Sequence, residues 1–126
     1  MGSQDPLKPN EWIRLKKSFS HAFAGIIKTF MSERNFKIHT GAAVIVIVCG
    51  FVFRLSVLEW AVMFILIGGM LALELMNTAV EHAVDLITKK SHPLAKAAKD
   101  AAAGAVCVFA AVSCIIGLLI FLSKLF

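Results

Sequence analysis

The 126-residue chain carries three long apolar stretches, which predict three membrane helices at residues 38–58, 60–88 and 94–122. The first stretch contains a single charged residue, Arg54, and the first half of the second contains none. At about 1.5 Å per residue, each stretch is long enough to cross a hydrocarbon core about 30 Å thick. Short polar segments separate them, so neighbouring helices should run antiparallel. The pattern predicts an all-α integral membrane fold.

A further helix is predicted at residues 12–31, where apolar residues recur every three or four positions and basic residues occupy mainly the other faces. This amphipathic pattern suits a helix that lies on a membrane surface. A helix packed on a soluble core is the alternative interpretation. A polar junction with Glu33, Lys37 and His39 follows and leads into the first apolar stretch.

The second apolar stretch ends in a row of polar residues that share one helix face. At about 100° per residue, Glu74, Asn77, Glu81 and Asp85 fall on a single stripe. Carboxylates near membrane depth are costly, so they need partners such as a metal, cationic side chains or a phosphorylated ligand. In the alternative interpretation, Glu81 and Asp85 are solvated at the end of the helix and Asn77 bridges two helices.

Composition agrees with a small membrane protein of one domain spanning residues 1–126. Hydrophobic residues make up 59% of the chain, and its mean hydropathy is +0.82. So short a chain encloses a water-excluding site poorly, which favours an oligomer with sites between subunits. The net charge of +5 would suit nucleic acid, but the apolar stretches argue against that partner. Cys49, Cys107 and Cys114 lie in apolar runs and are interpreted as small buried residues.

The distribution of charge predicts the orientation in the membrane. Residues 1–37 hold seven Lys or Arg and three Asp or Glu, and the segment between the second and third apolar stretches is also basic. The connection between the first two stretches carries only Arg54 and Glu59. The positive-inside rule therefore places the N-terminus and the polar stripe on the cytoplasmic side. ATP and Mg²⁺ are available there.

The polar residues support a particular chemistry. If the second and third membrane helices lie side by side, Lys99 and Asp100 approach the Glu81 end of the stripe, although they could instead form an exposed helix start. Glu33 enters the membrane at the same level and adds a third acidic wall. Converging carboxylates suit Mg²⁺, with phosphate oxygens completing its coordination. Lys99 could then stabilise a transferred phosphoryl group, while the deeper Glu74 accepts the proton of a lipid hydroxyl. The chain contains no Walker sequence and no protein-kinase motif.

The sequence Glu74-Leu-Met-Asn-Thr-Ala-Val-Glu-His-Ala-Val-Asp85 resembles the signature E-[ILV]-x-N-[ST]-A-[IV]-E-x-x-V-D of the prokaryotic diacylglycerol kinase family. The Lys99-Asp100 pair and the Glu33-x-x-Phe36-basic junction also match that family. The segment 92–107 is similar to the Gram-positive branch, whose members resemble undecaprenol kinase. Departures from the enterobacterial members lie at His21, Phe23 and His39, on or just after the amphipathic arm that meets lipid or nucleotide.

The resemblance implies a homotrimer in a bacterial cell membrane, with ATP as phosphate donor and Mg²⁺ required. It implies that Glu74 is the catalytic base, that Asn77 positions it, and that Glu33 and Glu81 bind the metal. Asp85 and Lys37 would support the site. The residues implied to lie near nucleotide or phosphate, besides the metal ligands, are Arg14, His21, Lys90, Ser91, His92, Lys99 and Asp100.

The resulting hypothesis is an ATP-dependent kinase that phosphorylates the hydroxyl of undecaprenol, with diacylglycerol as the alternative acceptor. A small ion-coupled transporter is a second hypothesis, because an intramembrane Glu74 could be its binding site. That hypothesis leaves Glu33, Lys99 and Asp100 without a role. A non-catalytic membrane assembly subunit is a third, and it would need none of the polar stripe.

Overall fold

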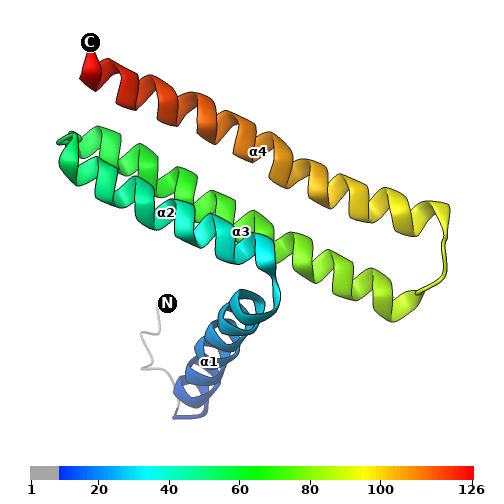
Figure 1. Cartoon of the computed structure of the whole chain (residues 1–126). Helices are drawn as coiled ribbons and strands as arrows, with labels where there is room; N and C mark the ends of the chain where they lie inside the picture. The colour runs from blue at the N-terminus through cyan, green and yellow to red at the C-terminus, as the bar shows by residue number, and fades with distance from the viewer. Residues whose placement is uncertain (1–8) are drawn as a thin grey trace, which may run out of the picture.

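A computed structural model of the protein describes residues 9–126, and within that range the chain is helical with no strand. Its helices α2, α3 and α4 are each long and apolar enough to cross a membrane, which confirms the predicted all-α membrane fold. α1 lies at a steep angle to these three (Figure 1). The helices span Pro9–Ser32 (α1), Arg34–Val52 (α2), Val57–Ile87 (α3) and Pro93–Leu125 (α4).

The helix ends differ from the predicted ones where local chemistry stops or starts a helix. α2 ends at Val52 instead of continuing to residue 58, because Arg54 adopts a left-handed conformation with φ of 56°. The amide of Leu55 donates to the carbonyl of Gly50 at 3.1 Å, which satisfies one carbonyl of the last turn. The backbone therefore reverses direction within a few residues.

The same turn makes α3 begin at Val57, before the predicted start at residue 60. The Ser56 hydroxyl accepts a hydrogen bond from the Glu59 amide at 3.2 Å, and the Ser56 amide donates to the Glu59 carboxylate at 2.9 Å. This reciprocal cap fixes the first turn of α3. With 31 residues, α3 is about 47 Å long at 1.5 Å per residue, so it extends beyond a hydrocarbon core of about 30 Å.

α1, α2 and α4 also begin before the residues predicted for them. α1 begins at Pro9 instead of 12, and α2 at Arg34 instead of 38, because the backbone returns to helix directly after Glu33. α4 begins at Pro93 and continues to Leu125, past the predicted end at 122. Proline suits a first helical position, and the His92 Nδ1 atom accepts a hydrogen bond from the Leu94 amide at 3.1 Å.

α3 is the central helix, and each of the other helices contacts it (Figure 1). α2 covers the N-terminal half of α3, whereas α4 runs along its whole length. The buried residues of α3 recur every three or four positions, as expected for one packed face: Met63, Leu66, Met70, Glu74 and Thr78.

α4 buries none of its residues within the single chain. The prediction that the cysteines are buried is wrong for Cys107 and Cys114, which are exposed, while Cys49 is half-buried. The reason is geometric. A helix that packs mainly against one neighbour leaves most of its surface to lipid or to another subunit.

A close contact between α2 and α3 generates a test of the packing. The indole of Trp60 lies directly over Gly50, where a Cβ atom would collide with it. At Gly41 on the same helix, no described residue packs against the position that a Cβ atom would take. We expect Gly50→Ala to lower the free energy of unfolding by about 1–3 kcal/mol. Gly41→Ala, the matched control, should raise it by up to about 1 kcal/mol, because alanine favours helix.

Denaturant titration of the purified variants in detergent micelles measures both values. Equal changes at the two positions would show that Trp60 does not pack against Gly50 as described.

Candidate active site

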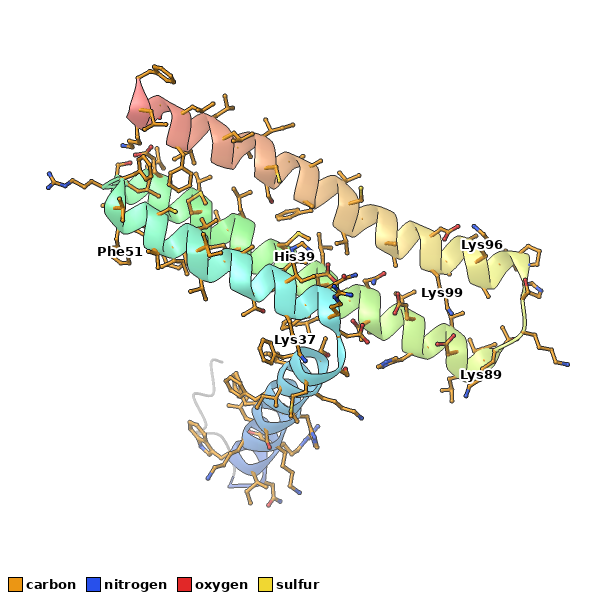
Figure 2. The ribbon with its side chains drawn as sticks, viewed as in Figure 1. Lys37, His39, Phe51, Lys89, Lys96 and Lys99 are labelled. Carbon is orange, nitrogen blue, oxygen red and sulfur yellow. The ribbon has the colours of Figure 1, made fainter. Side chains whose placement is uncertain are left out.

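Glu74 lies on the packed face of α3 and is only 6% exposed. Its Oε1 atom is 3.1 Å from Nε2 of His39, which projects from the first turns of α2 (Figure 2). Thr78, one turn further along α3, is equally buried. A carboxylate held in this way, away from water, can accept a proton from a hydroxyl group brought beside it.

Asn77 and Glu81 are the next residues of the polar stripe, closer than Glu74 to the C-terminal end of α3. Both side chains are half-buried, and the Asn77 amide nitrogen donates to the Glu81 carboxylate at 3.3 Å. The Oδ1 atom of Asn77 is buried and has no hydrogen-bond partner among residues 9–126. Because buried polar atoms are rarely left unpaired, this oxygen is free to meet a ligand, a water or a metal ion. Asn77 therefore orients Glu81 and presents an acceptor of its own.

Lys99 reaches from α4 toward α3 and binds Asp85 at 2.6 Å (Figure 2). The structure thus brings Lys99 to the stripe, as the arrangement of the two helices predicted. Asp100 does not join it. Its carboxylate turns outward to Lys96 at 2.5 Å, and both of those side chains are largely exposed. Successive residues on a helix point about 100° apart, so only one of this pair can face α3.

Glu33 sits at the break between α1 and α2, where its own backbone is extended and its side chain makes no capping hydrogen bond. The neighbouring Phe36 and Thr29 are buried and fix this junction. Glu33 is half-buried, so its carboxylate is available to a ligand. Lys37 lies nearby on α2 and is exposed (Figure 2).

Among residues 9–126, no three His, Cys, Asp or Glu side chains gather closely enough to hold a metal by themselves. Mg²⁺ does not need such a cage, since it commonly takes one or two carboxylates and completes its coordination with water and phosphate oxygens. Glu33, Glu81 and the unpaired Oδ1 atom of Asn77 are hard oxygen donors of the type that Mg²⁺ uses. The donor set therefore fits this ion.

Other predicted site residues lie apart from the stripe within one chain. Arg14 is on the first half of α1, which points away from α2–α4, and it lines a shallow pocket there (Figure 1). His21 is exposed on the same helix. The loop at 90–92 is also exposed, and its His92 caps α4. These residues can approach the stripe only through a ligand or a second chain.

A largely apolar groove of about 430 Å³ runs between α2, α3 and α4. His39 lies on its wall together with apolar residues such as Val46, Met70 and Leu118. The groove therefore combines an apolar lining with an imidazole that touches Glu74.

The contact of His39 with Glu74 is the feature that the sequence pattern did not reveal. The sequence places His39 in the polar junction and marks it as a departure from the enterobacterial members, without indicating a partner for it. The four-residue spacing of Leu66, Met70, Glu74 and Thr78 was the available signal, because it places Glu74 on the packed face of α3. Which residue of α2 meets that face depends on the packing of the two helices.

Comparison with known proteins identifies the family. Residues 20–121 match the family described as prokaryotic diacylglycerol kinase. The chain is 66% identical to undecaprenol kinase of Bacillus subtilis, over 92% of this chain and 94% of that protein. It is 42% identical to a diacylglycerol kinase of Synechocystis, over 92% of this chain and 69% of that protein. The chain belongs to the prokaryotic diacylglycerol kinase family.

Proposed function

We propose that this protein is an ATP- and Mg²⁺-dependent lipid kinase that transfers the γ-phosphate of ATP to the hydroxyl of undecaprenol. The observation that carries this proposal is the 66% identity to an undecaprenol kinase across nearly the whole of both chains. Diacylglycerol is the second candidate acceptor, because the chain is 42% identical to a diacylglycerol kinase. The product would be undecaprenyl phosphate in the first case and phosphatidic acid in the second.

Glu74 is the proposed catalytic base. Its burial on the packed face of α3 supports this role, because a carboxylate screened from water can meet the hydroxyl of a lipid. The apolar groove that His39 shares offers a surface for the hydrocarbon part of such a substrate. Asn77 would orient the Glu81 carboxylate through its hydrogen bond to Glu81.

Glu33 and Glu81 are the proposed metal ligands. Bound Mg²⁺ would neutralise charge on the phosphate oxygens of ATP. Asn77 holds one oxygen of Glu81 in place, and Glu33 lies at a break in the backbone where no capping bond occupies its carboxylate. Glu81 therefore offers an oriented carboxylate and Glu33 a half-buried one, and an ion can bind either without first breaking a strong contact.

Lys99 is proposed to stabilise the phosphoryl group, with Asp85 holding the ammonium group toward α3. Lys37 would add positive charge at the α1–α2 junction. The remaining residues proposed to contact nucleotide or phosphate are Arg14, His21, Lys90, Ser91, His92 and Asp100. They lie apart from the stripe in one chain, so this part of the proposal requires ATP or a neighbouring subunit to bridge the distance.

A homotrimer in a bacterial cell membrane is also proposed. The apolar surface left open on α2 and α4 supports assembly, since neither helix buries much of itself in one chain. Basic residues of α1 and of the 89–99 segment favour a cytoplasmic location for the N-terminus and the active site. At the opposite end, Lys124 is paired with Glu59 at 2.6 Å and adds little net charge.

The activity itself is directly testable. Purified protein in mixed micelles with γ-labelled ATP and Mg²⁺ should label undecaprenol, and chelation of the metal should abolish the labelling. Diacylglycerol in place of undecaprenol should be labelled more slowly. If neither lipid is labelled at any Mg²⁺ concentration, the kinase proposal is wrong; preferential labelling of diacylglycerol would instead select the second acceptor.

The proposed role of Glu74 as the base is tested by the substitution Glu74→Gln. Glutamine keeps the shape of the side chain and cannot accept a proton as a carboxylate does. We expect kcat to fall by roughly 10²- to 10⁴-fold, while ATP binding persists. Glu59→Gln is the matched control, because Glu59 lies on the same helix at the opposite end and pairs with Lys124. It should leave kcat within about threefold, since it lies far from the proposed chemistry. Near-normal turnover of the Glu74 variant would exclude this residue as the base.

The role of Lys99 is tested against a similar ion pair at the other end of α4. Lys99→Met and Lys124→Met each remove the ammonium group from a 2.6 Å ion pair with a residue of α3. Only Lys99→Met should reduce kcat/KM for ATP, by about 10- to 100-fold, because a charge-assisted contact to phosphate is lost. Both variants should be similarly destabilised in denaturant titrations. Equal activity losses would mean that Lys99 acts only through stability.

A further inference from the structure

Among residues 9–126, His39 is the only side chain in ion-pair or hydrogen-bond contact with Glu74. Its Nε2 atom lies 3.1 Å from Oε1 of that carboxylate. The two residues come from different helices, α2 and α3, so this contact depends on how the helices pack.

The proposed reaction delivers a proton to Glu74 in every turnover. Glu74 must lose that proton before it can act as a base again. The side chain of Glu74 is 7% exposed, so direct release of the proton to water is obstructed. The site therefore needs a route by which Glu74 regains its charge before the next lipid binds.

We propose that His39 is this proton exit, a positioning residue that acts through Glu74 and restores its carboxylate. The inference rests on the proposed kinase function. The His39 side chain is 30% exposed, several times more than that of Glu74. Histidine changes charge within the physiological pH range, and its two ring nitrogens can accept a proton on one side and release one on the other. An imidazole at this place therefore lies between a buried acid and a more exposed part of the chain.

The step balances as follows. The lipid oxygen forms a bond to the γ-phosphorus while the bond from that phosphorus to the bridging oxygen of ADP breaks, and ADP keeps the electron pair. The hydroxyl proton moves to Glu74. It then passes to the Nε2 atom of His39, and the imidazolium releases a proton to water from its other nitrogen. Glu74 is again a carboxylate, and His39 is neutral with its proton on Nε2. Exchange with water moves this proton back to Nδ1, so that Nε2 can accept a proton in the next turnover.

The first turnover distinguishes a proton exit through His39, called the relay below, from a purely structural role of this residue. In His39→Gln, Glu74 begins as a carboxylate, so the first phosphorylated lipid per site should form at close to the wild-type rate. Later turnovers should be slower by roughly 10- to 100-fold, because the proton leaves Glu74 without help. The KM for ATP should be unchanged. Rapid-quench measurements of labelled lipid with excess ATP would show this as a burst followed by a slow phase.

Thr40→Val is the control on the neighbouring position, because the Thr40 hydroxyl donates only to the Phe36 carbonyl of its own helix, at 2.8 Å. It should show neither the burst nor the slow phase. In His39→Ala, added imidazole should raise the steady-state rate without changing the first turnover. Should the glutamine variant fail to fold, this rescue decides the question.

A slow first turnover in a folded His39 variant, or a lack of rescue by imidazole, would overturn the relay and leave the kinase function intact. Absence of lipid labelling by the wild-type protein would instead overturn the kinase proposal. The two failures are therefore distinguishable within one set of measurements.

Discussion

Burial of the Glu74 carboxylate in an apolar helix is the constraint around which the structure is arranged. Such a group is unfavourable unless it has a polar partner or a function that needs it. α2 supplies the partner, His39, and its helix begins at the level where Glu74 sits. The break at Glu33 is what allows α2 to begin there, because it separates the membrane helix from the amphipathic α1. The contact of Glu74 with His39 thus joins α2 to α3.

α4 is attached to α3 by contacts at both ends and in the middle. Lys99 binds Asp85 near one end, and Lys124 binds Glu59 near the other, each at 2.6 Å. Between them, the ring of Phe109 lies over Gly69 of α3. These contacts matter because α4 buries no residue of its own. The first of them also directs Lys99 toward the stripe, so an ion pair orients the side chain that is proposed to stabilise the phosphoryl group.

The site has a graded environment along α3. Glu74 is almost fully buried, Asn77 and Glu81 are half-buried, and Asp85 pairs with a lysine near the end of the bundle. A reaction between a lipid hydroxyl and a water-soluble nucleotide needs such a gradient, because its two substrates arrive from different solvents. The proposed base, Glu74, can then stay in apolar surroundings while the groups proposed to bind phosphate remain accessible. The length of α3, which exceeds the hydrocarbon core, is what makes the gradient possible.

The sequence alone determined the membrane fold and the composition of the stripe. Hydrophobic period and length specify helices locally, and the spacing of Glu74, Asn77, Glu81 and Asp85 fixes their common face. It also predicted that Lys99 meets the stripe, because a short loop forces α3 and α4 to lie antiparallel. The predicted helix ends were less accurate. Arg54 in a left-handed conformation and the Ser56 cap set the end of α2 and the start of α3 through local backbone geometry, which the spacing of hydrophobic residues does not reveal.

Only the tertiary structure decided which side chains meet across helices. It paired His39 with Glu74, a contact that the sequence did not predict. It also turned Asp100 outward to Lys96, although the sequence predicted that Asp100 would approach the stripe. It also left Arg14 and the 90–92 loop away from the stripe. The physical reason is that periodicity fixes the face of each residue on its own helix. The rotation and offset of one helix against another are set by packing, as where Trp60 closes over Gly50.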